Sequence, residues 1–221
     1  MPEITVDLGV PMHIGNTEAE FGERFSTGDW SRVGGNIQSL AFAISALSAF
    51  GTNAPNLFME VLTVKANLVD YGCALGDGTA ALAATLSELD ITGCDISADA
   101  VALAQARWPT LKFERDDIEH PTKTARVIWT SHVLEHLADP ASTVRELLKR
   151  CQYLVAMFPP ITKGDDTGPH IGAVMTDDWI PTLPDPLFRM GLKTYRTDVT
   201  SQPQATMQET SIFCVWKGDL T

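Results

Sequence analysis

One glycine-rich turn, at residues 72–78, constrains this chain more than any other segment. The apolar run Asn67-Leu68-Val69-Asp70-Tyr71 predicts a strand that ends near an acid, and the turn leads into the alanine-rich helix Thr79 to Leu86. A second acid, Asp95, closes the next apolar segment, Leu89 to Cys94. Glycines let a backbone approach a ligand closely, and an acid at the end of the second strand can bind both hydroxyls of a ribose. The pattern therefore predicts an adenine nucleoside site.

From residue 66 onward, segments typical of strands alternate with segments typical of helices. The predicted strands are 66–71, 90–95, 110–114, 126–131, 153–158, 192–198 and 210–217. The predicted helices are 78–88, 97–107 and 140–151, and a fourth, interrupted by prolines, at 176–189. Ser97 is the expected N-cap of the second helix, and Pro140 suits the first turn of the third.

Such alternation implies an α/β fold in which helices cover both faces of a sheet. We expect a Rossmann-like, doubly wound, mostly parallel seven-stranded sheet over residues 66–221. Residues 1–65 are expected to form an N-terminal helical cap, with helices at 36–50 and 57–64. Ligands of such sheets bind beyond the carboxyl ends of the strands, so the loops that follow the strands are the place to seek the site.

Composition argues against two classes of partner. The chain has a net charge of -12, with only 16 lysines and arginines in 221 residues, so we expect no nucleic acid partner. The longest apolar run, Leu40 to Phe50, is too short for a bilayer, and Met1 to Val10 lacks the basic start of a signal peptide. The four cysteines form no C-x-x-C pair. We expect a cytoplasmic protein with reduced cysteines and no membrane partner.

Four segments, in order, carry a resemblance to a known family. They are Val69 to Gly76, Asp95-Ile96-Ser97, Phe113 to Glu119, and Ser131-His132-Val133-Leu134-Glu135-His136-Leu137-Ala138-Asp139-Pro140. Over residues 66–217 the chain resembles the class I S-adenosylmethionine-dependent methyltransferases, in particular those small-molecule methyltransferases with a Leu-Glu-His segment after the fourth strand. S-adenosylmethionine is the cofactor that this resemblance implies.

The resemblance also implies roles for individual residues. Asp95 would bind the ribose hydroxyls, Ile96 would pack on adenine, and Asp117 would accept a hydrogen bond from the adenine amino group beside the backbone of Ile118. Ser131 would lie close to the methionine moiety. The turn after the first strand would line the methionine part of the cofactor, through Asp70, Gly72, Cys73, Ala74 and Gly76.

Two positions depart from the family pattern. Ala74 stands where a glycine is common, and its methyl group is tolerable if the local φ angle is negative. Arg126 stands where an acid commonly opens the fourth strand, which puts a contact at the strand edge in doubt but not the cofactor site. A nicotinamide dinucleotide site is the weaker interpretation, because only a loose G-x-G-x-x-A pattern exists, at Gly76, Gly78 and Ala81.

The histidines leave the chemistry open among three interpretations. His132, Glu135 and His136 would share one face of a helix, and His170 lies in a glycine-rich loop that could fold over the same place. The first interpretation is a divalent metal bound by these four residues, as in some relatives. The second is a metal-free general base, His136 or His170, with Glu135. In the third, Glu135 and His136 only brace the helix. The metal is the least favoured.

The predicted activity is methylation of a small molecule, with the hydroxyl of a sugar or natural product as the first candidate acceptor; amines and carboxylates remain open. Residues 25–35 are the candidate lid, in which Trp30 could stack on a ring and Arg32 could pair with an anion, or Trp30 could simply anchor a surface loop. The alternatives are a non-catalytic binding or scaffold module with this fold, and a macromolecule methyltransferase that needs a partner subunit. The sequence leaves the oligomeric state open.

Overall fold

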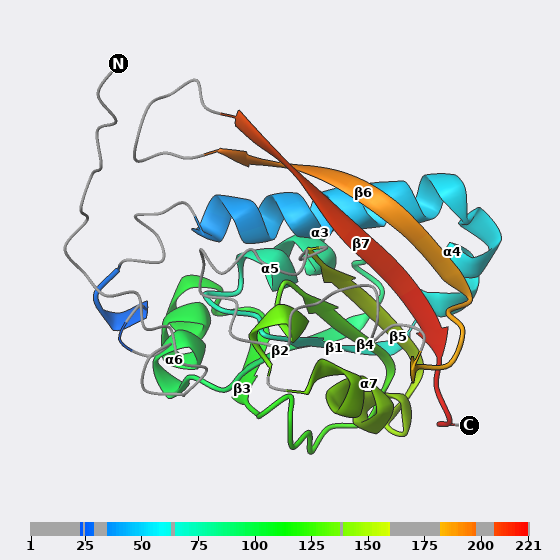
Figure 1. The fold of residues 1–221 in the computed structure, drawn as a ribbon. Coiled ribbons are helices and arrows are strands. Elements are labelled where there is room, and N and C mark those ends of the chain that lie inside the picture. Colours follow the sequence, from blue (N-terminus) through cyan, green and yellow to red (C-terminus); the bar gives the residue numbers. More distant parts are fainter. Residues whose placement is uncertain are drawn as a thin grey trace.

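A computed structural model describes residues 23, 25–28, 35–62, 65–137, 139–159, 182–197 and 206–220. These residues form a sheet with helices on both faces (Figure 1). The strands are β1 (Asn67–Tyr71), β2 (Asp90–Asp95), β3 (Lys112–Arg115), β4 (Ala125–Ser131), β5 (Cys151–Phe158), β6 (Phe188–Thr197) and β7 (Thr206–Lys217). The helices are α3 (Gly35–Asn53), α4 (Pro55–Val61), α5 (Asp77–Thr85), α6 (Ala98–Arg107), the 3-10 turn η1 (Leu134–His136) and α7 (Pro140–Leu148).

The strand order confirms the predicted doubly wound, mostly parallel sheet. It runs β3-β2-β1-β4-β5-β7-β6, with parallel pairing from β3 to β5 and antiparallel pairing of β7 with both β5 and β6. The switch in strand order lies between β1 and β4, because the chain first builds outward from β1 to β3 and then returns to the other side of β1. Ligands of open α/β sheets bind at such a switch point.

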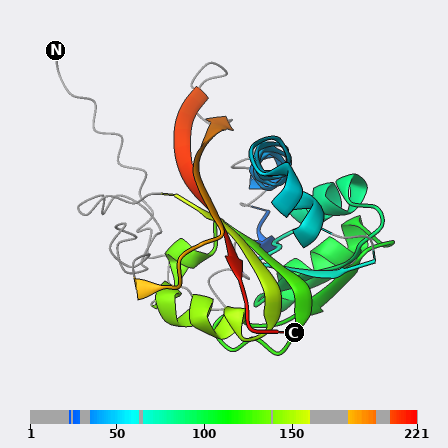
Figure 2. The same ribbon diagram turned by 90° about the vertical axis from the view of Figure 1, so that its right-hand side faces the viewer.

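Two apolar layers cover the sheet, one on each face. Phe42, Leu47 and Phe50 of α3 pack with the side chains of one sheet face, including Val127 and Phe213. On the opposite face, α7 packs Val144, Leu147 and Leu148 against Ile128 and Leu154. Figure 2 shows α3 and α7 on opposite sides of the strands. The division of the chain at residue 65 stays a prediction, and α3 shares the main core of the sheet.

The described helix ends follow the expected capping chemistry. The Ser97 hydroxyl accepts a hydrogen bond from the Ala100 amide at 3.2 Å, which confirms the predicted N-cap of α6. Pro140 occupies the first turn of α7, and the Asp139 carboxylate accepts from the Ser142 amide at 2.9 Å. All four cysteines are buried and free of disulfides. In the described part of the chain, no helix combines the length and apolar character that crossing a bilayer requires.

One predicted helix is wrong where it can be compared. Residues 182–187 are not α-helical, and the last two residues of the predicted span 176–189 already belong to β6; residues 176–181 lie outside the described part. The prolines of this segment account for the difference, because each one removes an amide donor and clashes with the preceding helical turn. The β-branched and aromatic residues beyond them pair with β7 instead.

Asp70 fastens the first helix of the sheet domain to β1. Its Oδ2 accepts a hydrogen bond from the Thr79 hydroxyl at 2.6 Å, which joins the end of β1 to the first turn of α5. The carboxyl group is almost completely buried. Burial raises its pKa from 3.8 to about 7, against the lowering effect of the bond from Thr79, and the nearby Asp95 raises the pKa further. The fold thus keeps a carboxyl group that holds its proton far more tightly than it would in the unfolded chain.

We expect Asp70→Asn to gain stability relative to the parent as pH rises. The folded pKa lies above the unfolded one, so this group favours folding least at high pH, and its contribution is lost between about pH 4 and 7. Asparagine does not titrate and keeps an oxygen for Thr79. The difference in unfolding free energy, variant minus parent, should rise by about 2–3 kcal/mol between pH 5 and 8 in urea denaturation. An equal difference at both pH values would show that Asp70 has an ordinary pKa.

Candidate functional site

The turn after β1 has a backbone that few residues other than glycine can adopt. Gly72 and Gly76 have φ angles of 77° and 79°, and Ala74 has 49°. A Cβ on Gly72 would lie 2.1 Å from Cγ2 of Val133, and one on Gly76 would lie 2.6 Å from Cζ of Phe113. The negative φ under which a methyl group would be tolerable is therefore not what Ala74 adopts. Its strain is of the kind that persists where neighbouring groups over-determine the backbone, as they do here.

Those neighbouring groups belong to the end of β2. The carbonyl of Cys94 accepts hydrogen bonds from the amides of Gly72 and Cys73, at 2.8 and 3.0 Å. The Asp95 carboxylate then accepts from the Ala74 amide at 2.9 Å through Oδ2 and from the Ser97 amide at 3.0 Å through Oδ1. Asp95 therefore holds the turn after β1, the strand that borders the switch point, against the start of α6.

Asp95 keeps capacity for a ligand. Each carboxylate oxygen can accept two hydrogen bonds, and each of these has one backbone donor. Burial raises the pKa of this carboxyl, and the amides of Ser97, Ala74 and Ile96 oppose that rise. A pair of ribose hydroxyls would supply the further donors that a buried carboxylate favours. The residue fits the role that the family resemblance implies.

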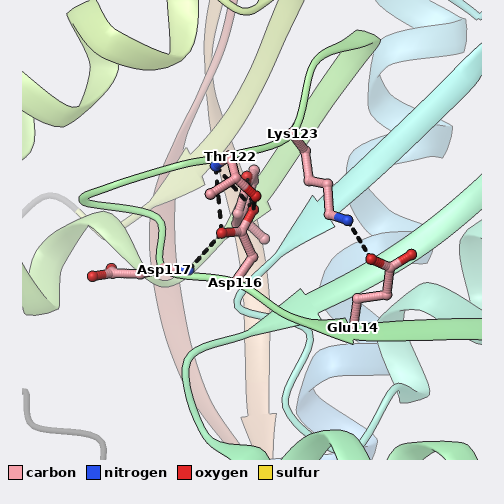
Figure 3. Close-up of polar contacts among 6 residues, drawn as sticks. Glu114, Asp116, Asp117, Thr122 and Lys123 are labelled. Carbon is pink, nitrogen blue, oxygen red and sulfur yellow. Dashed lines mark hydrogen bonds and ion pairs between the residues drawn. The ribbon is translucent and has the colours of Figure 1, made fainter.

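The two acids after β3 have different surroundings. Asp117 is partly exposed; its Oδ1 accepts from the Glu119 amide at 2.9 Å, and its Oδ2 lies 2.9 Å from Nδ1 of His120. Asp116 is buried and accepts from Tyr71 and Thr122 (Figure 3). A buried aromatic hydroxyl 45 residues away is a partner that no sequence signal indicates.

The carboxyl end of β4 carries polar atoms that lack partners. The hydroxyl oxygens of Thr130 and Ser131 and the Oε2 atom of Glu135 are buried, and none has a hydrogen-bond partner in the described structure. Buried polar atoms without partners are rare in native proteins, because each costs roughly 1–3 kcal/mol. Three of them at one strand end indicate a place where a polar ligand completes the bonding, and Ser131 is the residue expected near the methionine moiety.

His132 is engaged at both ring nitrogens. Nδ1 lies 3.3 Å from Oε1 of Glu135, Nε2 lies 3.2 Å from the Ser211 hydroxyl, and the ring stacks on Phe42 with centroids 3.8 Å apart. Its φ angle is 57°, so the chain turns sharply there. The predicted α-helix through His132, Glu135 and His136 is wrong, since only the 3-10 turn η1 forms. His132 and Glu135 nonetheless meet, through that turn rather than along a helix face.

Glu135 is a buried carboxylate that stays ionised. Burial alone would raise its pKa, but the hydrogen bond from His132 and the charges of His132 and His136 outweigh burial and lower the pKa below its usual value. Because Oε1 faces His132, the unpartnered Oε2 is the atom left for a ligand. An anionic oxygen of this kind accepts hydrogen bonds and cannot donate one.

Other predicted site residues are only partly testable. His170, Trp30 and Arg32 lie outside the described residues. Phe25, the first residue of the candidate lid, shares a buried cluster with Ala74 and Leu75 of the turn after β1. Within the described ranges, no three histidine, cysteine, aspartate or glutamate side chains are grouped so that they could hold a metal ion. The metal hypothesis, which includes His170, stays untested.

Arg126, which stands where the family commonly has an acid at the start of the fourth strand, makes contacts of a different kind. Its guanidinium donates to the Glu60 carbonyl at 2.8 Å and to the side chain of Gln152, and it lies 5.4 Å from the centre of the Tyr153 ring. These contacts join α4 to the first residues of β4 and β5, at the sheet edge opposite to the site. The departure at residue 126 therefore leaves the cofactor edge intact.

Comparison with known proteins agrees with this geometry. The sequence model of the methyltransferase domain family matches residues 69–152. A trans-aconitate 2-methyltransferase of Deinococcus radiodurans is 35% identical over 75 residues, which are 34% of this chain and 29% of that protein. Another, of Methylobacterium nodulans, is 32% identical over 90 residues, 40% of this chain and 35% of that protein. The matches thus span about a third of the length of these curated relatives.

Solved structures share the fold at low identity. A chain in the complex of the Haloferax volcanii Trm112 methyltransferase activator with a methyltransferase superposes with a TM-score of 0.64 and 13% identity, over 91% of this chain and 98% of that one. Coclaurine N-methyltransferase, bound to N-methylheliamine and SAH, gives 0.57 and 11%, over 79% and 72%. Residues 69–152 thus match the methyltransferase domain family, and these structures share the fold and strand order of the described part of the chain.

Proposed function

We propose that this protein transfers a methyl group from S-adenosylmethionine to a small molecule. The observation that carries the proposal is the buried Asp95, which fixes the left-handed turn after β1 and keeps lone pairs for a ligand at the carboxyl end of β2. The cofactor supplies a methyl group on a sulfonium sulfur, which a nucleophile takes by in-line displacement. The task of the protein is then to align the acceptor, exclude water and receive a proton where the nucleophile carries one.

The cofactor would lie along the carboxyl ends of β1, β2, β3 and β4. Asp95 would accept hydrogen bonds from the ribose hydroxyls, Ile96 and Ile118 would flank the adenine, and Asp117 would accept from its amino group. The turn of Asp70, Gly72, Cys73, Ala74 and Gly76 would line the methionine part. Ser131, whose hydroxyl has no partner in the described structure, would donate to or accept from that same part.

The buried Glu135 favours an acceptor that carries a proton. Its Oε2 would accept the hydrogen bond of a hydroxyl and orient that oxygen for attack, with His136 or His170 as a further proton acceptor. A carboxylate acceptor, as the trans-aconitate in the names of the two relatives would be, carries no proton and would meet an ionised carboxylate of the same sign. We therefore place a hydroxyl of a sugar or natural product first.

Two further interpretations differ in what they predict for the same measurements. A scaffold module with this fold would lack affinity for the cofactor. A macromolecule methyltransferase would bind the cofactor but would need a partner subunit to act. With a net charge of -12, nucleic acid would be repelled at long range, which favours the small-molecule acceptor.

We expect Asp95→Asn to bind S-adenosylhomocysteine about 100-fold more weakly than the parent, as measured by calorimetric titration. The substitution removes the charge that strengthens hydrogen bonds from both ribose hydroxyls, each worth roughly 1.5–3 kcal/mol. Asp90→Asn is the matched control, because Asp90 is exposed at the opposite end of β2, and its affinity should equal that of the parent. Equal affinity in Asp95→Asn would remove Asp95 from the site, and no binding to the parent would favour a scaffold.

We expect Glu135→Gln to lower kcat with a hydroxyl acceptor by roughly 100-fold while it leaves the affinity for S-adenosylhomocysteine within about twofold. Glutamine keeps the volume of the side chain but cannot attract the acceptor proton. Glu88→Gln is the control, because Glu88 is exposed in the loop between α5 and β2. A panel of hydroxyl, amine and carboxylate acceptors should give turnover with hydroxyls. If the carboxylates alone are methylated, and Glu135→Gln speeds them, our choice of acceptor is wrong.

We expect activity to survive dialysis against a chelator and to fall in His136→Ala or His170→Ala. A general base loses roughly 100- to 10,000-fold in rate when it is removed, whereas a metal site would lose activity with the ion. Metal analysis of the purified protein accompanies the assay. Loss of activity on chelation, with recovery on adding a divalent ion, would favour the metal; full activity in both variants would leave these histidines a structural role.

A further inference from the structure

The buried Asp116 accepts hydrogen bonds from four donor groups at the end of β3. Its Oδ2 accepts from the Tyr71 hydroxyl at 2.7 Å and from the hydroxyl and amide of Thr122, each at 3.1 Å. Its Oδ1 accepts from the Asp117 amide at 3.0 Å and shares the Thr122 amide at 3.4 Å. Figure 3 shows the carboxylate of Asp116 between Thr122 and the backbone of Asp117. A carboxylate with four donors is fully bonded, so Asp116 is positioned to order its surroundings rather than to bind a ligand itself.

These bonds connect the segments that would bind the cofactor. Tyr71 is the last residue of β1 and directly precedes Gly72, and Thr122 ends the loop that carries Asp117 and Ile118. The Asp116 amide donates to the Asp95 carbonyl at 3.1 Å. Asp116 thus connects three parts of the expected site. They are the end of β1, the backbone of Asp95, and the loop after β3, which it contacts at Asp117 and Thr122.

Electrostatics keep the Tyr71 hydroxyl of this network protonated. Burial raises the pKa of Tyr71, and the hydrogen bond to Asp116 raises it further, so the hydroxyl remains a donor. Beyond Thr122, the ammonium group of Lys123 pairs with the Glu114 carboxylate across the base of the loop (Figure 3). The loop is therefore closed by a buried neutral–anionic network on one side and by a partly exposed ion pair on the other.

These hydrogen bonds determine where the backbone of Asp117 lies. Its amide is held by Asp116, and its side chain points away from Asp116 and Thr122 (Figure 3). On that held backbone, the Glu119 amide and the His120 ring, each 2.9 Å from one carboxylate oxygen, orient the side chain of Asp117. An oxygen held ready in this way discriminates between a base that presents an amino group and one that presents a carbonyl.

We propose that Asp116, together with Tyr71 and Thr122, is a positioning set that gives the site its selectivity for the adenine amino group. The proposal rests on the proposed function, since it takes the S-adenosyl group as the ligand. None of the three residues touches the base. They act through Asp117, and loss of one bond lets that carboxylate rotate or retreat without removing it.

The test compares two ligands by calorimetric titration, S-adenosylhomocysteine and S-inosylhomocysteine. The second ligand presents a carbonyl oxygen where the first has the amino group, so the parent should bind it about 100-fold more weakly. Tyr71→Phe and Thr122→Val remove one donor each and keep the shape. We expect each to bind S-adenosylhomocysteine about 10-fold more weakly and S-inosylhomocysteine within twofold of the parent. In turnover, KM for the cofactor should rise while kcat changes by less than twofold.

Tyr153→Phe is the matched control. It also removes a tyrosine hydroxyl bonded to a carboxylate, that of Glu60, but on the sheet edge opposite to the loop after β3. Its ratio of affinities for the two ligands should equal that of the parent, and a thermal melt should show every variant folded at the temperature of titration. Asp117→Asn should reverse the preference, because an amide can donate to the carbonyl of the second ligand.

Each outcome bears on a separate statement. If the parent binds neither ligand, the proposed function fails. If the parent prefers S-adenosylhomocysteine and Tyr71→Phe and Thr122→Val keep the whole preference, the positioning role fails while the proposed function stands. If the parent binds both ligands equally, no selectivity exists for Asp116 to support, and the inference is overturned. A ratio that falls equally in Tyr153→Phe would show a general effect of stability instead.

Discussion

The hydrogen bonds that the Asp95 carboxylate accepts from the amides of Ala74 and Ser97 are the constraint on which the rest of the site depends. They join the turn after β1 to the start of α6, and they hold Ala74 in a left-handed conformation that would otherwise be costly. Steric limits reinforce them, since neither Gly72 nor Gly76 has room for a Cβ. A single buried acid therefore sets both the shape of the turn and the position of the expected ribose.

The sequence predicted the sheet well because its signals are local. Apolar runs, Ser97 as an N-cap and Pro140 in a first turn are each read over a few residues, and the structure confirms them. The acids at the ends of β2 and β3 also follow from the strand boundaries. What could not be predicted depends on distant residues. The left-handed φ of Ala74 depends on Asp95, the contact of His132 with Ser211 spans 79 residues, and the burial of Asp116 depends on Tyr71. Spacing alone also cannot separate a 3-10 turn from an α-helix, which is why η1 differs from the prediction.

Two buried acids near the carboxyl ends of the strands have pKa values shifted in opposite directions, although burial raises both. Asp70 has one hydroxyl donor, and burial moves its pKa to about 7. Glu135 is equally buried, but His132 donates to it and His136 lies near, so its pKa falls below its usual value. The difference lies in the neighbours rather than in depth. A carboxylate that is ionised in the interior and has one oxygen without a partner lowers the stability of the fold. Such destabilising groups are characteristic of sites where a bound ligand completes the hydrogen bonding.

The charges of the buried acids also affect whether the sulfonium cofactor or its thioether product would bind more tightly at the carboxyl ends of the strands. Asp95 is buried at the end of β2, Asp116 directly after β3, and Glu135 in η1, which follows β4. On the proposed reaction, the cofactor enters with a positive sulfonium and leaves as a neutral thioether. A cluster of acids in a region shielded from water attracts the charged form more strongly than the neutral one. On the proposed function, this arrangement would favour binding of the cofactor over retention of its product.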